Sequence, residues 1–290
     1  MAVLGIGLLG LAGVVPTGRA AEQKTVTVKG SDTMVNLASF WAEAFMKKAP
    51  GIDVTVTGGG SGTGIAALLN GTTDICNASR KIQEKELDEA AKRGIAPREH
   101  VAALDGIAVV VNPANPVSEL TLEQLKKIYI GTYPRWSAVG GPDWAIVLLS
   151  RETSSGTYAF FQEEVLGRMD YAPSALLMPA TSAIVQAVAE DKGAIGYVGL
   201  GYPEEAKGKV KVLKVKKDKD APAVAPTVGT VPSGEYPIAR ALYLYTNGEP
   251  KGSIRAYIDF CRSAEGQKIV EALGFVPLPA KEEASPKTEP

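Results

Sequence analysis

Histidine and cysteine are scarce in this sequence, and their scarcity excludes several kinds of site. The 290 residues contain one His and two Cys. These residues cannot supply the four ligands of a Cys/His zinc site. A Ser-His-Asp hydrolase would have to use His100, because it is the only histidine in the sequence. We therefore expect no metal site, no cofactor and no catalytic residues.

An excess of charge of either sign is also missing. The sequence has 31 Lys and Arg against 32 Asp and Glu, which gives a formal net charge of -1. Nucleic acids are bound mainly through clustered positive charge that neutralises their phosphates. We therefore do not expect a nucleic acid as a partner.

Long apolar runs are absent apart from one at the start of the chain. Residues 2–15 carry no charge but are too short to cross a bilayer core of about 30 Å. The run is typical of the apolar region of a secretory signal, and the small residues at 18 and 20 suit a cleavage site. No Lys or Arg precedes the run, as a truncated start would explain. We expect residues 1–20 to be a signal peptide and the mature protein to be a soluble, extracytoplasmic monomer, periplasmic or secreted. There Cys76 and Cys261 could form a disulfide or remain two buried thiols.

Short apolar strands alternate with amphipathic helices from residue 24 to about residue 275, which predicts an α/β fold. We expect strands at 24–29, 52–57, 73–78, 107–111, 145–149, 194–198 and 239–245. We expect helices after residue 33 and at 65–69, 81–92, 121–128, 158–166, 182–190 and 254–273. The lysine-rich segment 207–219 is typical of an exposed edge strand or hairpin rather than of a binding patch.

The strands at 107–111 and 239–245 bracket a self-contained α/β block. This arrangement predicts a discontinuous lobe 1 at 21–111 and 233–278, an inserted lobe 2 at 112–232, and a flexible tail at 279–290. Two crossings between lobes leave a cleft and a two-strand hinge, which suits closure over a ligand.

Three strand-to-helix turns are rich in Ser, Thr and Gly: SDT at 31–33, GSGTG at 60–64 and SSGT at 154–157. Each places hydroxyls and backbone N–H groups at the positive end of a helix dipole, which attracts anions. One such turn is usually an ordinary N-cap. Three of them, from both lobes, could converge on one small anion. A nucleotide P-loop is disfavoured, because Ile65 stands where its Lys should be, and no nucleophile elbow is present.

Three charged residues lie beside these turns. Arg151 precedes the third turn and could contact two anion oxygens, or form a surface salt bridge with Glu152. Arg80 could be a second anion contact, a lobe-closing ion pair or a solvated residue at a helix start. Asp74 could accept a hydrogen bond from a protonated anion, which would favour phosphate over sulfate, or it could cap a turn or pair with an Arg.

Five segments, GSDTM, GGGSGTG, TDICNASR, SRETSSGTYAFF and GAIGYVGLGY, resemble in order and spacing the periplasmic phosphate-binding protein of the ABC-type phosphate transporter. The resemblance covers residues 25–278. It implies a two-lobed type II periplasmic-binding-protein fold and a non-enzymatic receptor that binds inorganic phosphate and delivers it to transmembrane permease subunits. The matching positions are Thr33, the backbone of Met34, Ser61, Arg151, Ser155, Gly156 and Thr157, with Ser31 as a further contact.

Two positions depart from the enteric form of this family. In that form an Asp that accepts the ligand's proton follows an Ala-Ser pair, whereas Arg80, as in another branch of the family, follows Ala78-Ser79 here. The enteric form also holds its binding Arg with an Asp two residues later, where this chain has Thr153.

Three alternatives remain open at this stage. The first is a receptor of the same fold for sulfate, molybdate or tungstate. The second is a secreted phosphatase or hydrolase that uses Ser61 or Ser155 with His100. The third is an adhesin or signalling module that has kept the fold and lost transport.

Overall fold

The computed structural model describes residues 24–202, 206 and 208–279. The expected signal peptide and the expected tail from residue 280 lie outside these residues. In the described part of the chain, no helix combines the length and the hydropathy that crossing a membrane requires.

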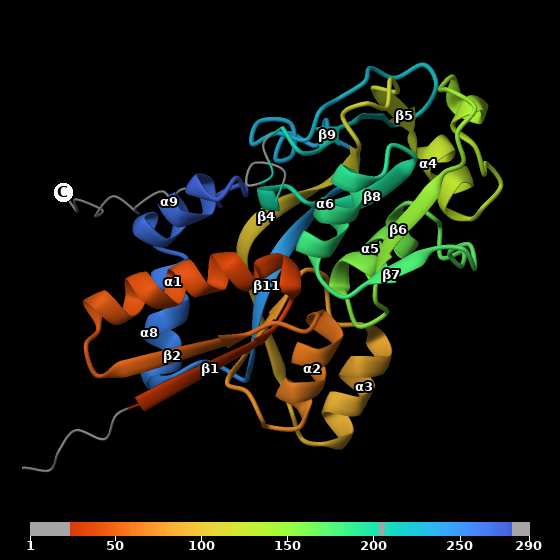
Figure 1. Cartoon of the computed structure of the whole chain (residues 1–290). Coiled ribbons are helices and arrows are strands. Elements are labelled where there is room, and N and C mark those ends of the chain that lie inside the picture. The colour runs from red at the N-terminus through yellow and green to blue at the C-terminus, as the bar shows by residue number, and fades with distance from the viewer. Residues whose placement is uncertain (1–23, 203–205, 207, 280–290) are drawn as a thin grey trace, which may run out of the picture.

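One long sheet connects two halves of the molecule (Figure 1). Among the described residues its strand order is β2-β1-β3-β11-β4-β8-β6-β7, with β9 paired to β4, and a second small sheet pairs β10 with β5. The strands are β1 Lys24–Gly30, β2 Ile52–Thr57, β3 Ile75–Ala78, β4 Pro97–Val111, β5 Glu119–Thr121, β6 Val147–Arg151, β7 Leu176–Met178, β8 Ala194–Gly199, β9 Lys211–Val212, β10 Lys214–Lys216 and β11 Ala239–Asn247.

Helices cover the sheet in both halves. They are η1 Asp32–Met34, α1 Val35–Lys48, α2 Ser61–Leu69, α3 Glu84–Lys92, α4 Leu122–Tyr129, η2 Trp136–Val139, α5 Gly156–Glu164, α6 Thr181–Glu190, α8 Gly252–Cys261 and α9 Ala264–Ala272. We call the part built on β1, β2 and β3, with α1, α2, α3, α8 and α9, the first half. The part built on β6, β7 and β8, with α4, α5 and α6, is the second half.

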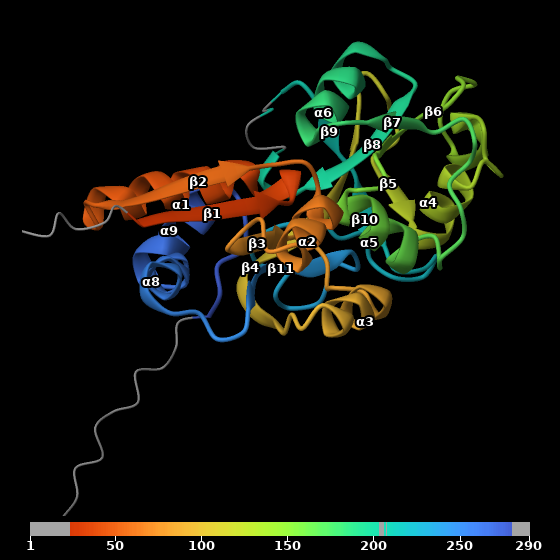
Figure 2. The ribbon, with the colours of Figure 1, turned by 90° about the horizontal axis from the view of Figure 1, so that it is seen from below.

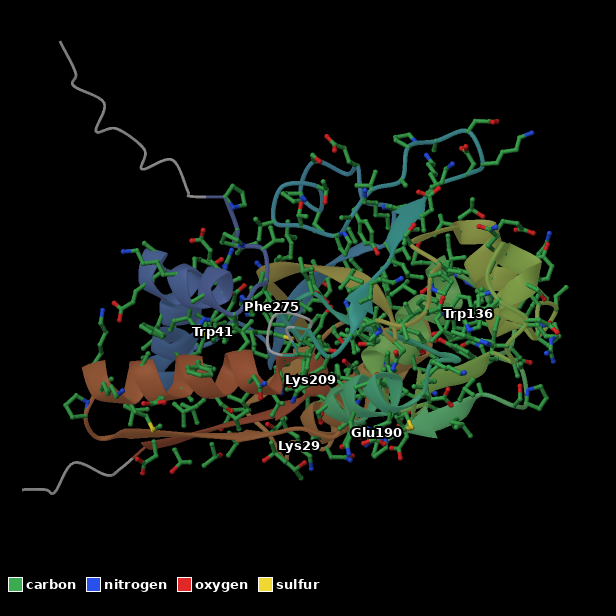
Figure 3. All side chains as sticks on the ribbon, turned by 45° about the horizontal axis from the view of Figure 1, so that its top comes forward. Lys29, Trp41, Trp136, Glu190, Lys209 and Phe275 are labelled. Carbon is green, nitrogen blue, oxygen red and sulfur yellow. The ribbon has the colours of Figure 1, made fainter. Side chains whose placement is uncertain are left out.

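Two strands, β4 and β11, run between the halves (Figure 2). β4 pairs with β11 as far as Gly106 and with β8 from Ile107 onward, in both cases antiparallel. Separate hydrophobic clusters lie on either side of this change, one around Trp41 and the other around Trp136 (Figure 3). On β4, Ala103 belongs to the cluster around Trp41 and Ile107 to the cluster around Trp136. The change from one cluster to the other thus comes before residue 111, where the lobe boundary was predicted.

Parallel pairing places the three Ser/Thr/Gly turns at strand ends that face the junction of the halves. β1 pairs in parallel with β2 and β3, so the turns after β1 and β2 leave the same edge of the sheet. β6 pairs in parallel with β8 and β7 and leads into the third turn. This edge is where ligands bind in open α/β sheets.

Three sequence predictions about elements have clear outcomes. The edge strands in the lysine-rich segment are confirmed, since β9 and β10 lie there with Leu213 and Val215 buried. The single helix at 254–273 is wrong, because the chain breaks at Arg262 and Ser263 caps a second helix, α9. The strand at 107–111 is only the second part of β4, which begins at Pro97.

Both cysteines are buried free thiols. Cys76 packs in a cluster with α2, whereas Cys261 packs in the cluster around Trp41. Of the two alternatives, the structure therefore has two buried thiols and not a disulfide between Cys76 and Cys261.

Candidate functional site

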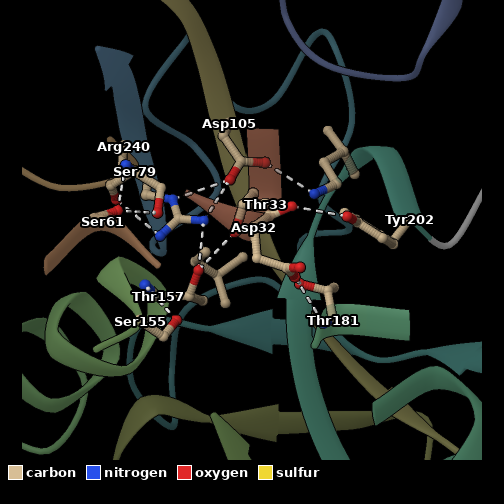
Figure 4. A network of polar contacts seen from close by, with 12 residues as sticks. Asp32, Thr33, Ser61, Ser79, Asp105, Ser155, Thr157, Thr181, Tyr202 and Arg240 are labelled. Carbon is tan, nitrogen blue, oxygen red and sulfur yellow. Dashed lines mark hydrogen bonds and ion pairs between the residues drawn. The ribbon is translucent and has the colours of Figure 1, made fainter. Parts of the chain in front are cut away.

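The three turns meet between the two halves (Figure 4). Thr33 Oγ1, in the turn after β1, lies 2.8 Å from Thr157 Oγ1 in the first turn of α5. Gly62 N, at the start of α2, donates a 2.9 Å hydrogen bond to Ser154 O. The N-terminal ends of η1, α2 and α5 are thus close neighbours, although the first two belong to the first half and the third to the second half.

Buried serine hydroxyls surround this meeting point. Ser61 Oγ accepts a 3.0 Å hydrogen bond from Ser79 N and lies 3.3 Å from Ser79 Oγ. Ser155 caps α5, because its Oγ accepts from Thr157 N at 3.2 Å and from Tyr158 N at 3.4 Å. Each hydroxyl that accepts from a backbone N–H keeps its own proton for another acceptor.

Gly156 lies against this serine pair. A Cβ atom at this position would lie 2.6 Å from Ser79 Oγ and closer still to Ser61 Oγ. Only glycine therefore lets α5 approach α2 this closely.

The first turn contains buried polar atoms without a partner in the described structure. Ser31 N donates to Asn77 O at 2.9 Å, but Ser31 Oγ and both polar atoms of the Asn77 side chain have no hydrogen bond. Buried hydroxyls and amides nearly always have one, so these atoms are candidates for contact with a ligand. The Met34 N–H, by contrast, donates to Ser31 O at 3.1 Å and closes the 3-10 turn.

Arg151 is buried and held from both halves. Its Nη1 donates to Thr181 Oγ1 at 2.7 Å and its Nη2 to Pro179 O at 3.1 Å, both in the second half. Asp32 Oδ2, from the first half, lies 3.2 Å from Nη1 and also accepts from Thr181 N. Arg151 therefore pairs with Asp32, and the carboxylate that the enteric form places near position 153 comes here from the opposite half.

Arg80 forms an ion pair within the first half. Its Nη1 and Nη2 each donate to one oxygen of Glu86 at 2.8 Å, which is a bidentate geometry. Burial raises the pKa of Glu86, but hydrogen bonds from Arg80 and from Gln83 N outweigh it and lower the pKa below its usual value. The Arg80 Nε is buried without a partner. Arg80 therefore neither pairs across the lobes nor extends into solvent.

Asp74 does not lie at the three turns. Its Oδ2 accepts 2.8 Å hydrogen bonds from Thr27 N and Thr27 Oγ1. Thr27 lies four residues before Ser31 on β1, or roughly 13 Å along an extended strand. This carboxylate ties the residue that precedes β3 to β1.

Two charged residues that the sequence reasoning missed complete the cluster. Arg240 on β11 donates from Nε and Nη2 to Asp105 Oδ2 on β4, at 2.9 and 2.8 Å. Burial raises the pKa of Asp105 and lowers that of Arg240, while the bonds between them oppose both shifts. One charged residue inside each of the apolar segments AALDGIAVVV and PIARALYLY was the signal that could have revealed them.

The chemistry of the cluster suits anion binding better than hydrolysis. Hydroxyls and guanidinium groups are hydrogen-bond donors to oxyanions, and here they are buried where water competes little. His100 lies elsewhere, since its Nε2 lies 3.1 Å from Thr246 Oγ1, and burial lowers its pKa. No group of three or more His, Cys, Asp or Glu able to hold a metal ion occurs among the described residues.

Comparison with known proteins identifies the family. Residues 15–265 match the model of the PBP superfamily domain. Phosphate-binding protein PstS of Staphylococcus saprophyticus is 37% identical over 285 residues, covering 96% of this chain and 87% of that protein. Phosphate-binding protein PstS of Pseudomonas aeruginosa is 32% identical over 269 residues, covering 87% of this chain and 82% of that protein. The chain belongs to the phosphate-binding protein family.

Solved structures of the phosphate-binding protein family have the same fold. A structure from Clostridium perfringens, described as a phosphate ABC transporter substrate-binding protein with bound phosphate, superposes with a TM-score of 0.79 at 30% identity and covers 88% of this chain and 100% of its own. An ABC-type phosphate transport receptor from Vibrio cholerae gives a TM-score of 0.70 at 29% identity, with the same coverages. The type II periplasmic-binding-protein fold implied by the sequence resemblance is confirmed.

Proposed function

We propose that this protein binds inorganic phosphate between its two halves, outside the cytoplasm, and delivers it as a monomer to the permease subunits of an ABC transporter. One observation carries the proposal: three helix N-terminal ends, with their Ser and Thr hydroxyls, meet where the two halves face each other, and the buried Arg151 lies beside them, paired with Asp32 of the first turn. Helix ends and a guanidinium together replace the hydration of a small oxyanion without any basic surface.

The residues proposed to contact phosphate come from all three turns. They are Ser31, Thr33, Ser61, Arg151, Ser155, Gly156 and Thr157, whereas Met34 is left out because its backbone N–H already donates to Ser31 O. The proposal leaves Asp74 out and gives Arg80 a supporting part, because its bidentate pair with Glu86 fixes the segment that follows Ser79. β4 and β11 would form the hinge, since they are the strands that both halves share.

A competing oxyanion remains the second candidate, for a specific reason. Asp32 lies in the first turn and Asp105 is joined to Thr157 through Arg240, and each carboxylate is paired with an arginine and accepts a hydrogen bond from a backbone amide. The carboxylate that would reject a fully ionised anion such as sulfate is therefore already occupied.

Calorimetric titration of the purified protein with phosphate, sulfate, molybdate and tungstate tests the proposal. We expect phosphate to bind and the other three to compete weakly. Thr157→Val removes a hydroxyl at nearly constant shape and should weaken phosphate binding about 10-fold or more. Thr153→Val, an exposed position in the same turn, is the matched control and should bind like the wild type. Absence of phosphate binding by the wild type would overturn the proposed function. If sulfate binds more tightly than phosphate, a sulfate receptor replaces a phosphate receptor as the function.

A further inference from the structure

A buried arginine and a buried aspartate lie opposite each other on the two strands that connect the halves. Arg240 on β11 and Asp105 on β4 are register partners. Their side chains are 2% and 0% exposed, and two hydrogen bonds join them. Neither residue belongs to the three turns or to the set of phosphate contacts proposed above.

The hydrogen bonds of this pair reach both halves. Arg240 Nη1 donates to Ser79 O at 2.9 Å in the first half, and Arg240 Nη2 donates to Thr157 Oγ1 at 3.1 Å in the second half. Asp105 Oδ1 accepts from Leu200 N at 2.8 Å, just after β8. Figure 4 shows the guanidinium between Asp105, Ser79 and Thr157. The pair therefore connects the crossing strands to both halves.

The bond to Thr157 determines what that hydroxyl can offer a ligand. A guanidinium only donates hydrogen bonds, whereas a hydroxyl has one proton and two acceptor lone pairs. Because Arg240 uses one lone pair of Thr157 Oγ1, the Thr157 proton must point to a different acceptor. Thr33 Oγ1, 2.8 Å away at the junction of the turns, is one acceptor within reach of that proton, and an oxyanion bound at the junction would be another. An oxyanion needs a donor at this place.

Stability alone gives little reason for such a pair. A buried ion pair rarely stabilises a fold more than well-packed apolar residues of the same size do. The same strands carry buried apolar residues close to the pair in sequence, Leu242 on β11 and Ile107 on β4, so an apolar pair would suit the character of both strands. A role in the site explains the pair better.

We propose that Arg240 is a positioning residue of the anion site, which holds the Thr157 hydroxyl as a donor and joins the closed cleft to the two crossing strands. The proposal rests on the function proposed above. Asp105 is the counter-charge that makes a buried guanidinium possible at this place.

A double-mutant cycle measured by phosphate calorimetry tests this role. The variants are Thr157→Val, the neutral pair Asp105→Asn with Arg240→Met, and all three changes together. The neutral pair avoids leaving one charge buried alone. We expect it to weaken phosphate binding about 10-fold in the wild-type background and hardly at all in the Thr157→Val background, since it acts through that hydroxyl. Arg255→Met, whose guanidinium pairs with Asp259 on the exposed side of α8, is the control and should bind like the wild type.

The outcomes separate this inference from the proposed function. Suppose that the wild type binds phosphate. If the neutral pair then binds it with wild-type affinity, or loses the same affinity in both backgrounds, the role of Arg240 is overturned and the proposed function stands. Failure of the wild type to bind phosphate would overturn both. If the neutral pair does not fold, Arg240→Lys takes its place: it keeps the charge beside Asp105 but loses the arm that reaches Thr157. Unchanged phosphate affinity in a folded Arg240→Lys protein would then overturn the inference.

Discussion

Arg151 and Asp32 form an ion pair whose partners come from opposite halves of the molecule. Asp32 Oδ2 lies 3.2 Å from Arg151 Nη1, and it also accepts a 2.7 Å hydrogen bond from Thr181 Oγ1. A carboxylate on the same half would hold the guanidinium at all times. Here bonds to Pro179 O and Thr181 Oγ1 within the second half already orient Arg151, and the first half adds the counter-charge of Asp32.

Replacing Asp32 by Asn should therefore weaken phosphate binding. The amide keeps the size of the side chain and its bond from Thr181, but it loses the charge that attracts Arg151. Loss of a charge-assisted hydrogen bond predicts an affinity about 10- to 100-fold lower in calorimetric titration. A second change, Thr153→Asp, should restore part of the affinity, because it supplies a carboxylate from the half that contains Arg151.

The control for this experiment is Asp74→Asn. Its carboxylate bonds to Thr27 on β1, so the variant should keep both its phosphate affinity and its preference over sulfate. A wild-type affinity in Asp32→Asn, or an equal loss in Asp74→Asn, would contradict the assignment of Asp32 as the counter-charge that supports Arg151 in the site.

The sequence indicates individual residues of the site but not their pairings. Ser61, Ser155 and Thr157 stand out because each begins a helix after a strand, which is a local pattern. The contacts of Thr33 with Thr157 and of Arg240 with Asp105 join residues 124 and 135 positions apart. Such contacts depend on the order and register of the strands in the sheet. A single sequence carries no local pattern that pairs residues so far apart along the chain. The bond of Asp74 to Thr27 is of the same kind, because it joins residues 47 positions apart on neighbouring strands.

At the scale of elements, most helices and strands follow from periodicity, and the misses have local causes. The first part of β4 reads PREHV, in which charged and apolar residues mix, because its early residues are partly exposed. Its pairing with β11 supplies the stability that the pattern does not show. The break between α8 and α9 was missed because apolar spacing continues through Arg262 and Ser263. There α9 turns back so that Gly266 packs directly against the Phe260 carbonyl.

Ser263 should contribute to stability as the N-cap of α9. Its Oγ accepts from Gly266 N at 3.3 Å and donates to Phe260 O at 2.7 Å. We expect Ser263→Ala to lower the free energy of unfolding by about 1 kcal/mol, measured by urea denaturation. Ser39→Ala is the matched control, because Ser39 is exposed within α1 and its hydroxyl only bonds back to Val35 O. Equal effects of the two changes would show that the cap contributes nothing.

At the scale of the whole molecule, several contacts that join the halves lie at the site. They include Gly62 N to Ser154 O, Thr33 to Thr157, Thr181 to Asp32, and the 2.9 Å hydrogen bond from Tyr202 Oη to Asp32 O. Each involves one of the three turns or the residue beside it. Opening of the cleft would therefore expose these groups to water together, and an anion that bridges the turns would favour the closed arrangement over the open one.

Gly156→Ala should separate closure from folding. The new methyl group would lie 2.6 Å from Ser79 Oγ, and Ser61 Oγ is closer still, so the halves could not approach fully. Overpacking of this kind costs about 1 to 3 kcal/mol, which predicts an affinity for phosphate that is lower by about 5- to 160-fold. Since the clash arises only between the halves, the variant should fold normally. Small-angle X-ray scattering should show a decrease in the radius of gyration when phosphate is added to the wild type and a smaller decrease in the variant.

The matched control for this variant is Gly58→Ala. It lies in the glycine segment before α2, where an added methyl group meets only ordinary contacts from 3.7 Å outward. We expect it to bind phosphate and to become compact as the wild type does. Normal compaction together with wild-type affinity in Gly156→Ala would contradict the closed contact between α2 and α5. Normal compaction with reduced affinity would instead assign Gly156 to direct contact with the anion and remove it from the control of closure.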